Sequence, residues 1–275
     1  MISLLSMIEI FDDIRKLYKF KSPCEELSDY IEFFSETSLD ATNQYINTEK
    51  FTVKLFPSYT PTIWINLGSP YRLSNGRKQV CIDAHTDILL LRNNIVERTN
   101  LRTDNIFTVK FHPGGFEAVF GIEQNKIGNA IININTLLPA DFLCKLKKLD
   151  AFEERTTMLQ EYFLHLLQVQ FRDNYLYQKV WKAVHTFQKS DMSYSNNKLA
   201  GELALTDKTM YRYFKSIIGI APKNYFSIVR TRTALTAYVS DKELFSPYHF
   251  GYYDMSHFRK AVIQFTGQPL SQCHS

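Results

Sequence analysis

The chain has 275 residues, of which 45% are hydrophobic and 22% are charged, and its net charge is +4. This composition is ordinary for a soluble protein, and the length allows two domains that each bury a core. The four cysteines share no metal-binding or redox spacing and are too sparse for a disulfide framework, which excludes these classes and favours reduced thiols.

The opening segment MISLLSMIEI is apolar, but it carries no basic region and runs into Glu9, Asp12 and Asp13. We therefore expect neither a signal peptide nor a membrane-spanning helix there, and no later stretch approaches the length of a span. The sequence predicts a cytoplasmic protein without a membrane partner.

The residues up to about Thr48 admit two interpretations. Leu27, Ile31 and Phe34 fall on one side of the chain if the segment is helical. The stretch from Ser28 to Phe34 is equally compatible with an entry strand. The sequence leaves both open.

From Phe51 the apolar residues recur with a period of two in short runs rich in Val, Ile, Phe and Thr, which predicts strands. Turn signals such as Gly68-Ser69-Pro70 and Pro113-Gly114-Gly115 separate the runs. Short antiparallel strands at this spacing predict a small barrel or sandwich. The runs are FTVKLF, TIWINL, RKQVCIDA, DILLL, NIFTVKF and FEAVF.

The β-rich region offers no pattern for catalysis. Its two histidines, His85 and His112, lie far apart without a His-x-His pair, whereas a metal site needs several converging ligands. Gly114 and Gly115 follow a proline in a turn and do not form a phosphate loop, and no nucleophile elbow is present. We expect no enzyme activity, no catalytic residue, no metal and no cofactor.

A helical period returns from about Ala140 to Phe171 and predicts two helices with wide apolar stripes. The helices could pack within the chain, which we take as the default, or form a dimer interface. A further helix from Gln178 to Phe187 precedes the polar link SDMSYSNN. The apolar positions of the two helices are Phe142, Leu143, Leu146, Leu149, Phe152, Leu159, Tyr162, Phe163, Leu166, Leu167 and Val169.

The stretch from Asn197 to Pro222 has the pattern of a helix-turn-helix. A short apolar helix is followed by Thr206 as the N-cap of a second helix, which Gly219 ends. One face of the second helix is apolar, and the other carries side chains of the kind that reach bases and phosphates in a major groove. The apolar stripe is Met210, Phe214, Ile217 and Ile218, and the polar face is Asp207, Lys208, Tyr211, Arg212 and Lys215.

The same pattern occurs again 48 residues later, with the spacing of the apolar stripe and the helix stop reproduced. Between the copies, Pro222 to about Val239 keeps a helical period without internal glycine or proline. We therefore expect one long helix to join two recognition modules that enter successive major grooves. The matched pairs are Met210 and Phe258, Phe214 and Val262, Ile217 and Phe265, and Gly219 and Gly267, with Pro222 and Pro269 following.

The charge is concentrated in the C-terminal region. From Leu176 onward there are 13 Lys and Arg and six Asp and Glu, a net charge of +7, which leaves −3 for the preceding residues. A basic end on a mildly acidic remainder is typical of a protein in which one part meets a polyanion.

The last hundred residues or so resemble the DNA-binding domain of the AraC/XylS family of transcription regulators. The resemblance rests on LAGELALTDKTMYRYFKSIIGIAPKNYF in the first module and GYYDMSHFRKAVIQFTGQPL in the second. It implies two sets of DNA-binding residues, and Lys215 and Lys260 belong to the same faces. The full set is Asp207, Lys208, Tyr211, Arg212, Lys215, Tyr253, Met255, Ser256, His257, Arg259 and Lys260.

The chain departs from the family pattern at two places. Ser246-Pro247 stands where an Ile-Ala pair usually opens the first helix of the second module, and proline breaks a helix interior. Either the second module recognises DNA more weakly than the first, or its first helix starts at Pro247. Ala204 stands where a glycine often relaxes the turn, and a left-handed alanine costs roughly 1 kcal/mol.

The segment TVKFHPGGFEAVFG, with PTIWINLG upstream, resembles the β-rich N-terminal domain of a subset of AraC-type regulators. That domain is a cupin-like effector sensor in related regulators, so the resemblance implies a pocket for a small molecule. The candidate lining residues are Trp64, Phe107, Phe111 and Phe116, and the alternative is that each belongs to a plain core.

The sequence thus predicts an α+β protein with a β-rich, cupin-like or small-barrel sensor domain at 1–140, a helical connector and possible dimer element at 141–172, and an all-α DNA-binding domain at 173–275. The predicted function is sequence-specific binding of double-stranded DNA as a transcription regulator, with activation the common mode in the family. RNA polymerase, a small-molecule effector and a second copy of the chain are further possible partners. The alternatives are a protein-interaction module with a degenerate second helix-turn-helix, and an enzyme with an unrecognised N-terminal site.

Overall fold

A computed structural model describes residues 15–75, 78–169 and 175–273. These residues form two compact units. Residues 15–55 and 59–169 make a unit of strands and helices, the β unit, and residues 56–58 and 175–273 make the helical unit. In the part of the chain that the structure describes, no helix combines the length and the apolar character needed to cross a bilayer. The opening segment discussed above lies outside the described residues.

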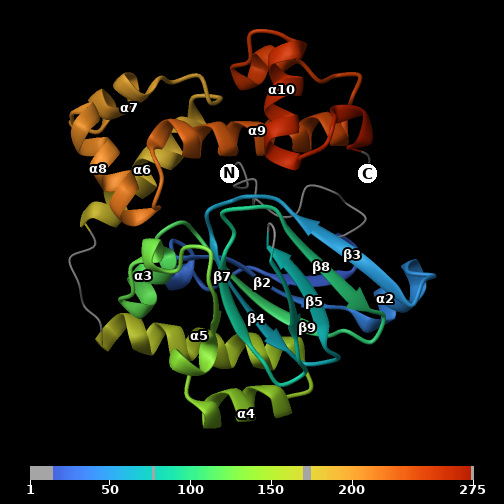
Figure 1. Cartoon of the computed structure of the whole chain (residues 1–275). Coiled ribbons are helices and arrows are strands. Elements are labelled where there is room, and N and C mark those ends of the chain that lie inside the picture. The colour runs from blue at the N-terminus through green and yellow to red at the C-terminus, as the bar shows by residue number, and fades with distance from the viewer. Residues whose placement is uncertain (1–14, 76–77, 170–174, 274–275) are drawn as a thin grey trace. The chain divides into compact units, whose positions relative to one another are not determined.

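The β unit contains two antiparallel sheets (Figure 1), with strand orders β1-β2-β9-β4-β7-β10 and β3-β8-β5-β6. Five of the six runs predicted as strands are strands, so the β-rich prediction is confirmed. The first sheet consists of β1 (Tyr18–Lys21), β2 (Ile31–Thr37), β9 (Ile106–Phe111), β4 (Pro61–Asn66), β7 (Ile88–Leu91) and β10 (Ile131–Asn133). The second consists of β3 (Lys50–Leu55), β8 (Val96–Leu101), β5 (Tyr71–Asn75) and β6 (Lys78–Ile82).

The six-stranded sheet has a core on each face because successive side chains of a strand point to opposite sides. Trp64 and Ile88 pack toward the four-stranded sheet. Ile63, Leu89 and Phe107 lie on the opposite face and pack against helices. The β unit is therefore layered as sheet, sheet and helices. Its helical elements are η1 (Glu25–Leu27), α2 (Leu39–Tyr45), α3 (Gly115–Phe120), η2 (Gln124–Lys126), η3 (Ile134–Thr136), α4 (Ala140–Lys148) and α5 (Phe152–Val169).

The helical interpretation of the residues before Thr48 is wrong for the segment that contains Ile31 and Phe34. Both residues lie in β2, which pairs with β1 on one side and β9 on the other, so the strand alternative is confirmed. Both faces of β2 are largely buried. The buried polar residues Ser35, Glu36 and Thr37 lie on both faces of this strand, so its sequence lacks the apolar–polar alternation of a half-exposed strand.

The run FEAVF is also not a strand. It forms α3, which begins after Gly114 in a left-handed conformation with a φ of 84°. Phe116 and Phe120 lie one helical turn apart with their ring centroids 4.7 Å from each other, and both Phe120 and Phe111 pack on Phe163 of α5. A short helix buried on nearly all sides shows no amphipathic period, so the sequence pattern could not separate it from a strand.

Helices α4 and α5 pack on the β unit. Leu146 of α4 and Leu159 and Phe163 of α5 belong to the core on the helix side of the six-stranded sheet. Arg155 of α5 is buried and pairs with Glu36 of β2, with nitrogen–oxygen distances of 2.7 and 2.8 Å. The packing within the chain that we took as the default is therefore observed, and a dimer interface on the remaining face stays a prediction.

One buried carboxylate makes the stability of the β unit depend on pH. Burial raises the pKa of Asp104 to about 6, although Oδ2 accepts a hydrogen bond from the Leu101 backbone N–H at 2.9 Å. Because the folded state binds this proton more tightly than the unfolded state, protonated Asp104 contributes to the free energy of unfolding at low pH. This contribution is lost as the pH rises through about 6.

Asp104→Asn should therefore raise the free energy of unfolding at pH 8 by about 1–2 kcal/mol. The lost attraction to Arg98 limits the gain. Urea unfolding of both proteins at pH 4 and pH 8 measures the effect. The two proteins should differ less at pH 4, and an equal difference at both pH values would contradict the assignment.

The helical unit contains α6 to α10 (Figure 1), and α9 runs between the two modules. The predicted architecture of a β-rich part followed by an all-α part is confirmed. The bounds are α6 (Tyr175–Lys189), α7 (Asn196–Glu202), α8 (Asp207–Ile217), α9 (Pro222–Ser240), η4 (Pro247–Phe250), α10 (Met255–Thr266) and η5 (Leu270–Gln272).

The first helix of the second module is reduced to one short turn. It starts at Pro247, as one of the two alternatives predicted, but it is the 3₁₀ helix η4 and ends at Gly251 with a φ of 69°. The proline ring fixes φ and removes a donor, which suits the first position of a helix. The second module therefore has a shorter support under its recognition helix than the first.

Candidate nucleic-acid interface

The first recognition helix, α8, presents a polar face to solvent. The hydroxyl of Thr206 caps its start and accepts a hydrogen bond from the Thr209 N–H at 3.1 Å. Met210, Phe214 and Ile217 are buried, so the orientation of the helix about its axis is fixed. The predicted DNA-binding residues of this module are all exposed: Asp207, Lys208, Tyr211, Arg212 and Lys215.

The second recognition helix, α10, repeats this arrangement. Asp254 caps its start, with Oδ1 accepting from the His257 N–H at 2.7 Å. Phe258, Val262 and Phe265 are buried. The predicted DNA-binding residues Tyr253, Ser256, His257, Arg259 and Lys260 are exposed, whereas Met255 is half-buried.

Helix α9 supports both modules. Near its start, the rings of Tyr225 and Phe226 lie 5.9 and 5.1 Å from Phe214 of α8. Near its end, Leu235 shares a core with Phe258 of α10. A helix of 19 residues is about 28 Å long, so one helix can carry both modules.

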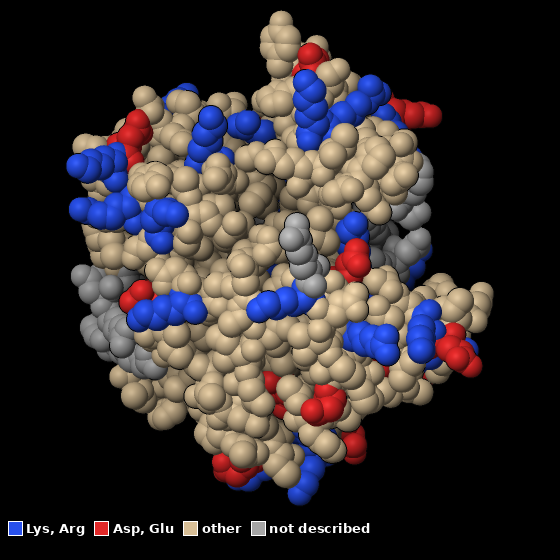
Figure 2. Space-filling model, in the orientation of Figure 1, with Lys and Arg blue, Asp and Glu red and all other residues tan. Residues whose placement is uncertain are grey.

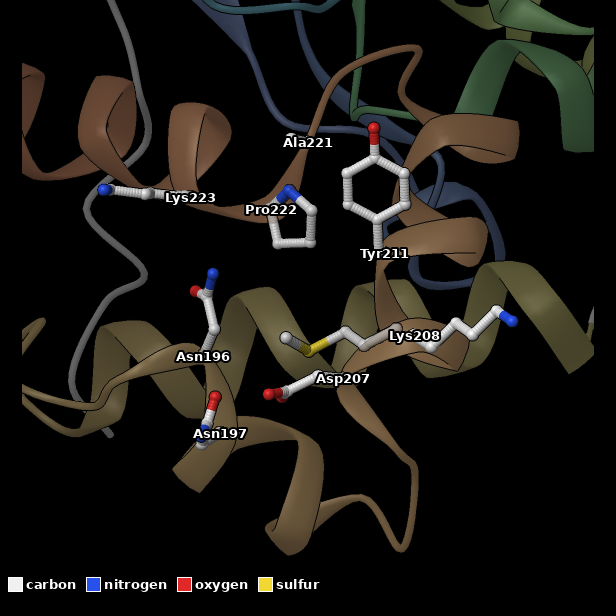
Figure 3. Close-up of a pocket in the computed structure, with 9 residues that line it drawn as sticks. Asn196, Asn197, Asp207, Lys208, Tyr211, Ala221, Pro222 and Lys223 are labelled. Carbon is white, nitrogen blue, oxygen red and sulfur yellow. The ribbon is translucent and has the colours of Figure 1, made fainter.

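A hollow of about 410 Å³ lies beside the start of α8 (Figure 3). Asp207 points toward Asn197, whose amide nitrogen can donate to both carboxylate oxygens. This contact occupies Asp207 and leaves Lys208 and Tyr211 as the freer side chains of the first turns. The hollow is lined by Asn196, Asn197, Asp207, Lys208, Met210, Tyr211, Ala221, Pro222 and Lys223.

On the face of the helical unit that Figure 2 shows, Lys and Arg side chains are more frequent than Asp and Glu. Because the recognition helices carry exposed cations at Lys208, Arg212, Lys215, Arg259 and Lys260, their faces suit a polyanion. Among the described residues, no three His, Cys, Asp or Glu side chains converge on a metal-sized space.

The turn between α7 and α8 carries a strained residue. Ala204 has a φ of 52°, in the left-handed region that a glycine would occupy without cost. The sequence prediction of a left-handed alanine at this position is confirmed.

Ala204→Gly should stabilise the helical unit by about 0.5 kcal/mol, since the relief of roughly 1 kcal/mol is offset in part by the entropy of an unfolded glycine. Thermal unfolding followed by Trp181 fluorescence of a Trp64→Phe chain measures the change. Ala237→Gly within α9 is the matched control and should destabilise by about 1 kcal/mol. If Ala204→Gly instead lowers the stability, the left-handed backbone of Ala204 is not a source of strain.

The four residues predicted to line an effector pocket do not lie together. Trp64 is in the core between the sheets, where the Arg98 guanidinium lies 4.7 Å from its ring. Phe107, Phe111 and Phe116 are in the core on the other face of the six-stranded sheet. All four are at most 2% exposed. They are core residues in the structure, as the alternative held, and one pocket cannot contain all four.

Sequence reasoning missed three residues near the interface. Asn197 approaches Asp207, and Lys223 lines the hollow from the start of α9. Arg230 contacts the loop before α7. Lys223 directly follows the helix-starting Pro222, a local signal that could have pointed to it. The contacts of Asn197 and Arg230 depend on the fold and leave no signal in the spacing.

The structure is similar to several solved structures over most of its length. ToxT from Vibrio cholerae strain SCE256 is 13% identical with a TM-score of 0.45, over 82% of this chain and 97% of that one. ToxT from Vibrio cholerae O395 is 13% identical with a TM-score of 0.46, over 80% and 95%. The AraC-like transcriptional activator CuxR is 13% identical with a TM-score of 0.31, over 83% and 89%.

No protein-family model and no curated protein matches this chain.

Proposed function

We propose that the protein is a sequence-specific transcription regulator that binds double-stranded DNA through α8 and α10. The observation that supports this most directly is the repeated geometry: two capped helices bury the same apolar stripe and expose their starts at the two ends of one shared helix. Lys and Arg contacts to phosphate would supply much of the affinity, and base contacts would supply the sequence choice.

A selection from random duplex DNA with the full chain, read out by gel shift at fixed salt, tests this function. Enrichment of a two-part motif with half-sites about one DNA turn apart is the expected result. Recovery of DNA without a shared motif would overturn sequence-specific binding.

A second function, a protein-interaction module, has one observation in its favour. The first helix of the second module is only the 3₁₀ turn η4, which gives α10 less support than α8 has. In that case the selection would yield at most one half-site, and the face of α10 would bind protein.

The proposal extends to an effector. The resemblance of the N-terminal region to a sensor domain supports it, while the four candidate aromatic residues do not. Calorimetry of the full chain against a broad panel of small metabolites tests it. Absence of heat across the panel would count against a sensor and leave the DNA proposal intact.

A further inference from the structure

We propose that Arg230, in the middle of α9, is a positioning residue that locks the two modules together and thereby fixes the spacing between the DNA half-sites. The part of this inference that concerns DNA spacing rests on the proposed function. The part that concerns the locking of the two modules rests on contacts within the helical unit.

Arg230 joins α9 to the entrance of the first module. Its Nη2 donates a hydrogen bond to the Met192 carbonyl at 2.8 Å, and its guanidinium lies 5.6 Å from the ring of Phe187 in α6. Met192 precedes α7 in the loop that leaves α6. The guanidinium therefore connects α6, the entrance of α7 and α9 at one point.

The loop is held in a strained shape at this contact. Asp191 and Met192 have φ values of 51° and 59°, in the left-handed region that costs an L-residue roughly 1–2 kcal/mol. The Met192 N–H bonds to the Phe187 carbonyl at 3.1 Å. Such conformations persist where the surroundings over-determine them, and the Arg230 bond is one of those determinants.

The second module meets the same point. A Cβ added to Gly251 would lie 3.2 Å from the Met192 carbonyl oxygen and 3.5 Å from Arg230 Nε. Gly251 itself has a φ of 69°. The next residue, Tyr252, hydrogen-bonds through its hydroxyl to Thr231 Oγ1 at 2.8 Å. The segment that enters α10 thus packs on Arg230 and on the carbonyl that Arg230 holds.

This junction gives the helical unit a stiffness that α9 alone would lack. Long helices curve, and two modules joined by a single rod would vary in mutual orientation. A guanidinium is planar and carries several donors in a fixed fork, so it can hold a carbonyl while packing against a ring and a backbone. A lysine would supply one flexible charge.

The DNA arm of the test uses a series of duplexes in which the spacer between the selected half-sites is changed by one base pair at a time. One base pair rotates the half-sites by about 35°, so the wild-type protein should lose at least about tenfold in affinity per step. Arg230→Met should reduce this preference to less than about threefold and keep its affinity for a single half-site. The spacing preference of Arg230→Lys should fall between them. Lys242→Met, which removes the same charge from an exposed residue after α9, should keep the wild-type spacing preference.

The geometric arm needs no DNA. Spin labels are placed at Glu202→Cys in α7 and Gln264→Cys in α10, both exposed, in a chain with Cys24, Cys81 and Cys144 changed to Ser. The distance distribution between them should be narrow in this protein and about twice as broad with Arg230→Met. Gly251→Ala, whose Cβ would press on the Met192 carbonyl, is a second variant that should broaden it in the same way.

The outcomes separate the two proposals. An unchanged distance distribution together with an unchanged spacing preference would overturn the role of Arg230. Equal weakening on every duplex, with the salt dependence reduced by about one charge, would also overturn it and make Arg230 a phosphate contact. If the wild-type protein binds none of the duplexes, the proposed function is overturned. The distance measurement would still decide whether Arg230 locks the modules.

Discussion

Replacing both Arg212 and Arg259 with alanine is expected to weaken binding to the selected DNA site by about 2–6 kcal/mol. A bidentate arginine contact to guanine is worth about 1–3 kcal/mol, and substitutions on separate helices should add. Both side chains are exposed, one on α8 and one on α10, so the fold should be little affected. Fluorescence anisotropy with the selected duplex and with a scrambled duplex, at one salt concentration, measures the loss.

The matched control for this pair is Lys189→Ala with Lys242→Ala. These residues are exposed, lie outside both recognition helices, and carry the same total charge. Their removal should weaken binding to both duplexes alike, by a smaller factor. If the arginine variant loses affinity equally for the selected and the scrambled duplex, the arginines contact phosphate only. If it loses none, α8 and α10 are not the helices that meet DNA.

The recognition helices could be predicted because their signals are local. Thr206 and Asp254 are N-cap residue types, and the stripes that begin at Met210 and Phe258 recur at helical spacing. Side chains on the opposite face must then be exposed, as the structure places them. Short strands such as β4 and β9 were predictable for the same reason, since a period of two is visible within six residues.

The remaining features depend on contacts between distant residues. Helix α3 is buried on nearly all sides, with Phe120 packed on Phe163, so its six residues show no amphipathic period. Trp64 lies on the opposite face of the sheet from Phe107, and this follows from strand register, which the resemblance to a sensor domain did not reveal. Arg230 meets Met192 across 38 residues of chain. A contact of this kind has no sequence pattern.

Arg155→Met is expected to lower the free energy of unfolding of the β unit by about 3–5 kcal/mol. The guanidinium donates to both carboxylate oxygens of Glu36 and also to the carbonyl groups of Leu149 and Asp150. Methionine retains much of the volume but leaves the Glu36 carboxylate buried without its counter-ion. Urea unfolding of the full chain with Trp181→Phe measures the loss, because Trp64 then remains as the single tryptophan and reports on the β unit.

The double variant Arg155→Met with Glu36→Leu separates charge from packing. Replacing a whole buried ion pair by apolar residues is often neutral, so most of the lost stability should return. Lys54→Met breaks the more exposed pair with Glu97 at 3.9 Å and should cost less than about 1 kcal/mol. If Arg155→Met loses no more stability than this control, the apolar contacts of Leu159 and Phe163 suffice to hold α5 on the sheet. The Glu36 carboxylate would then be hydrated in the variant.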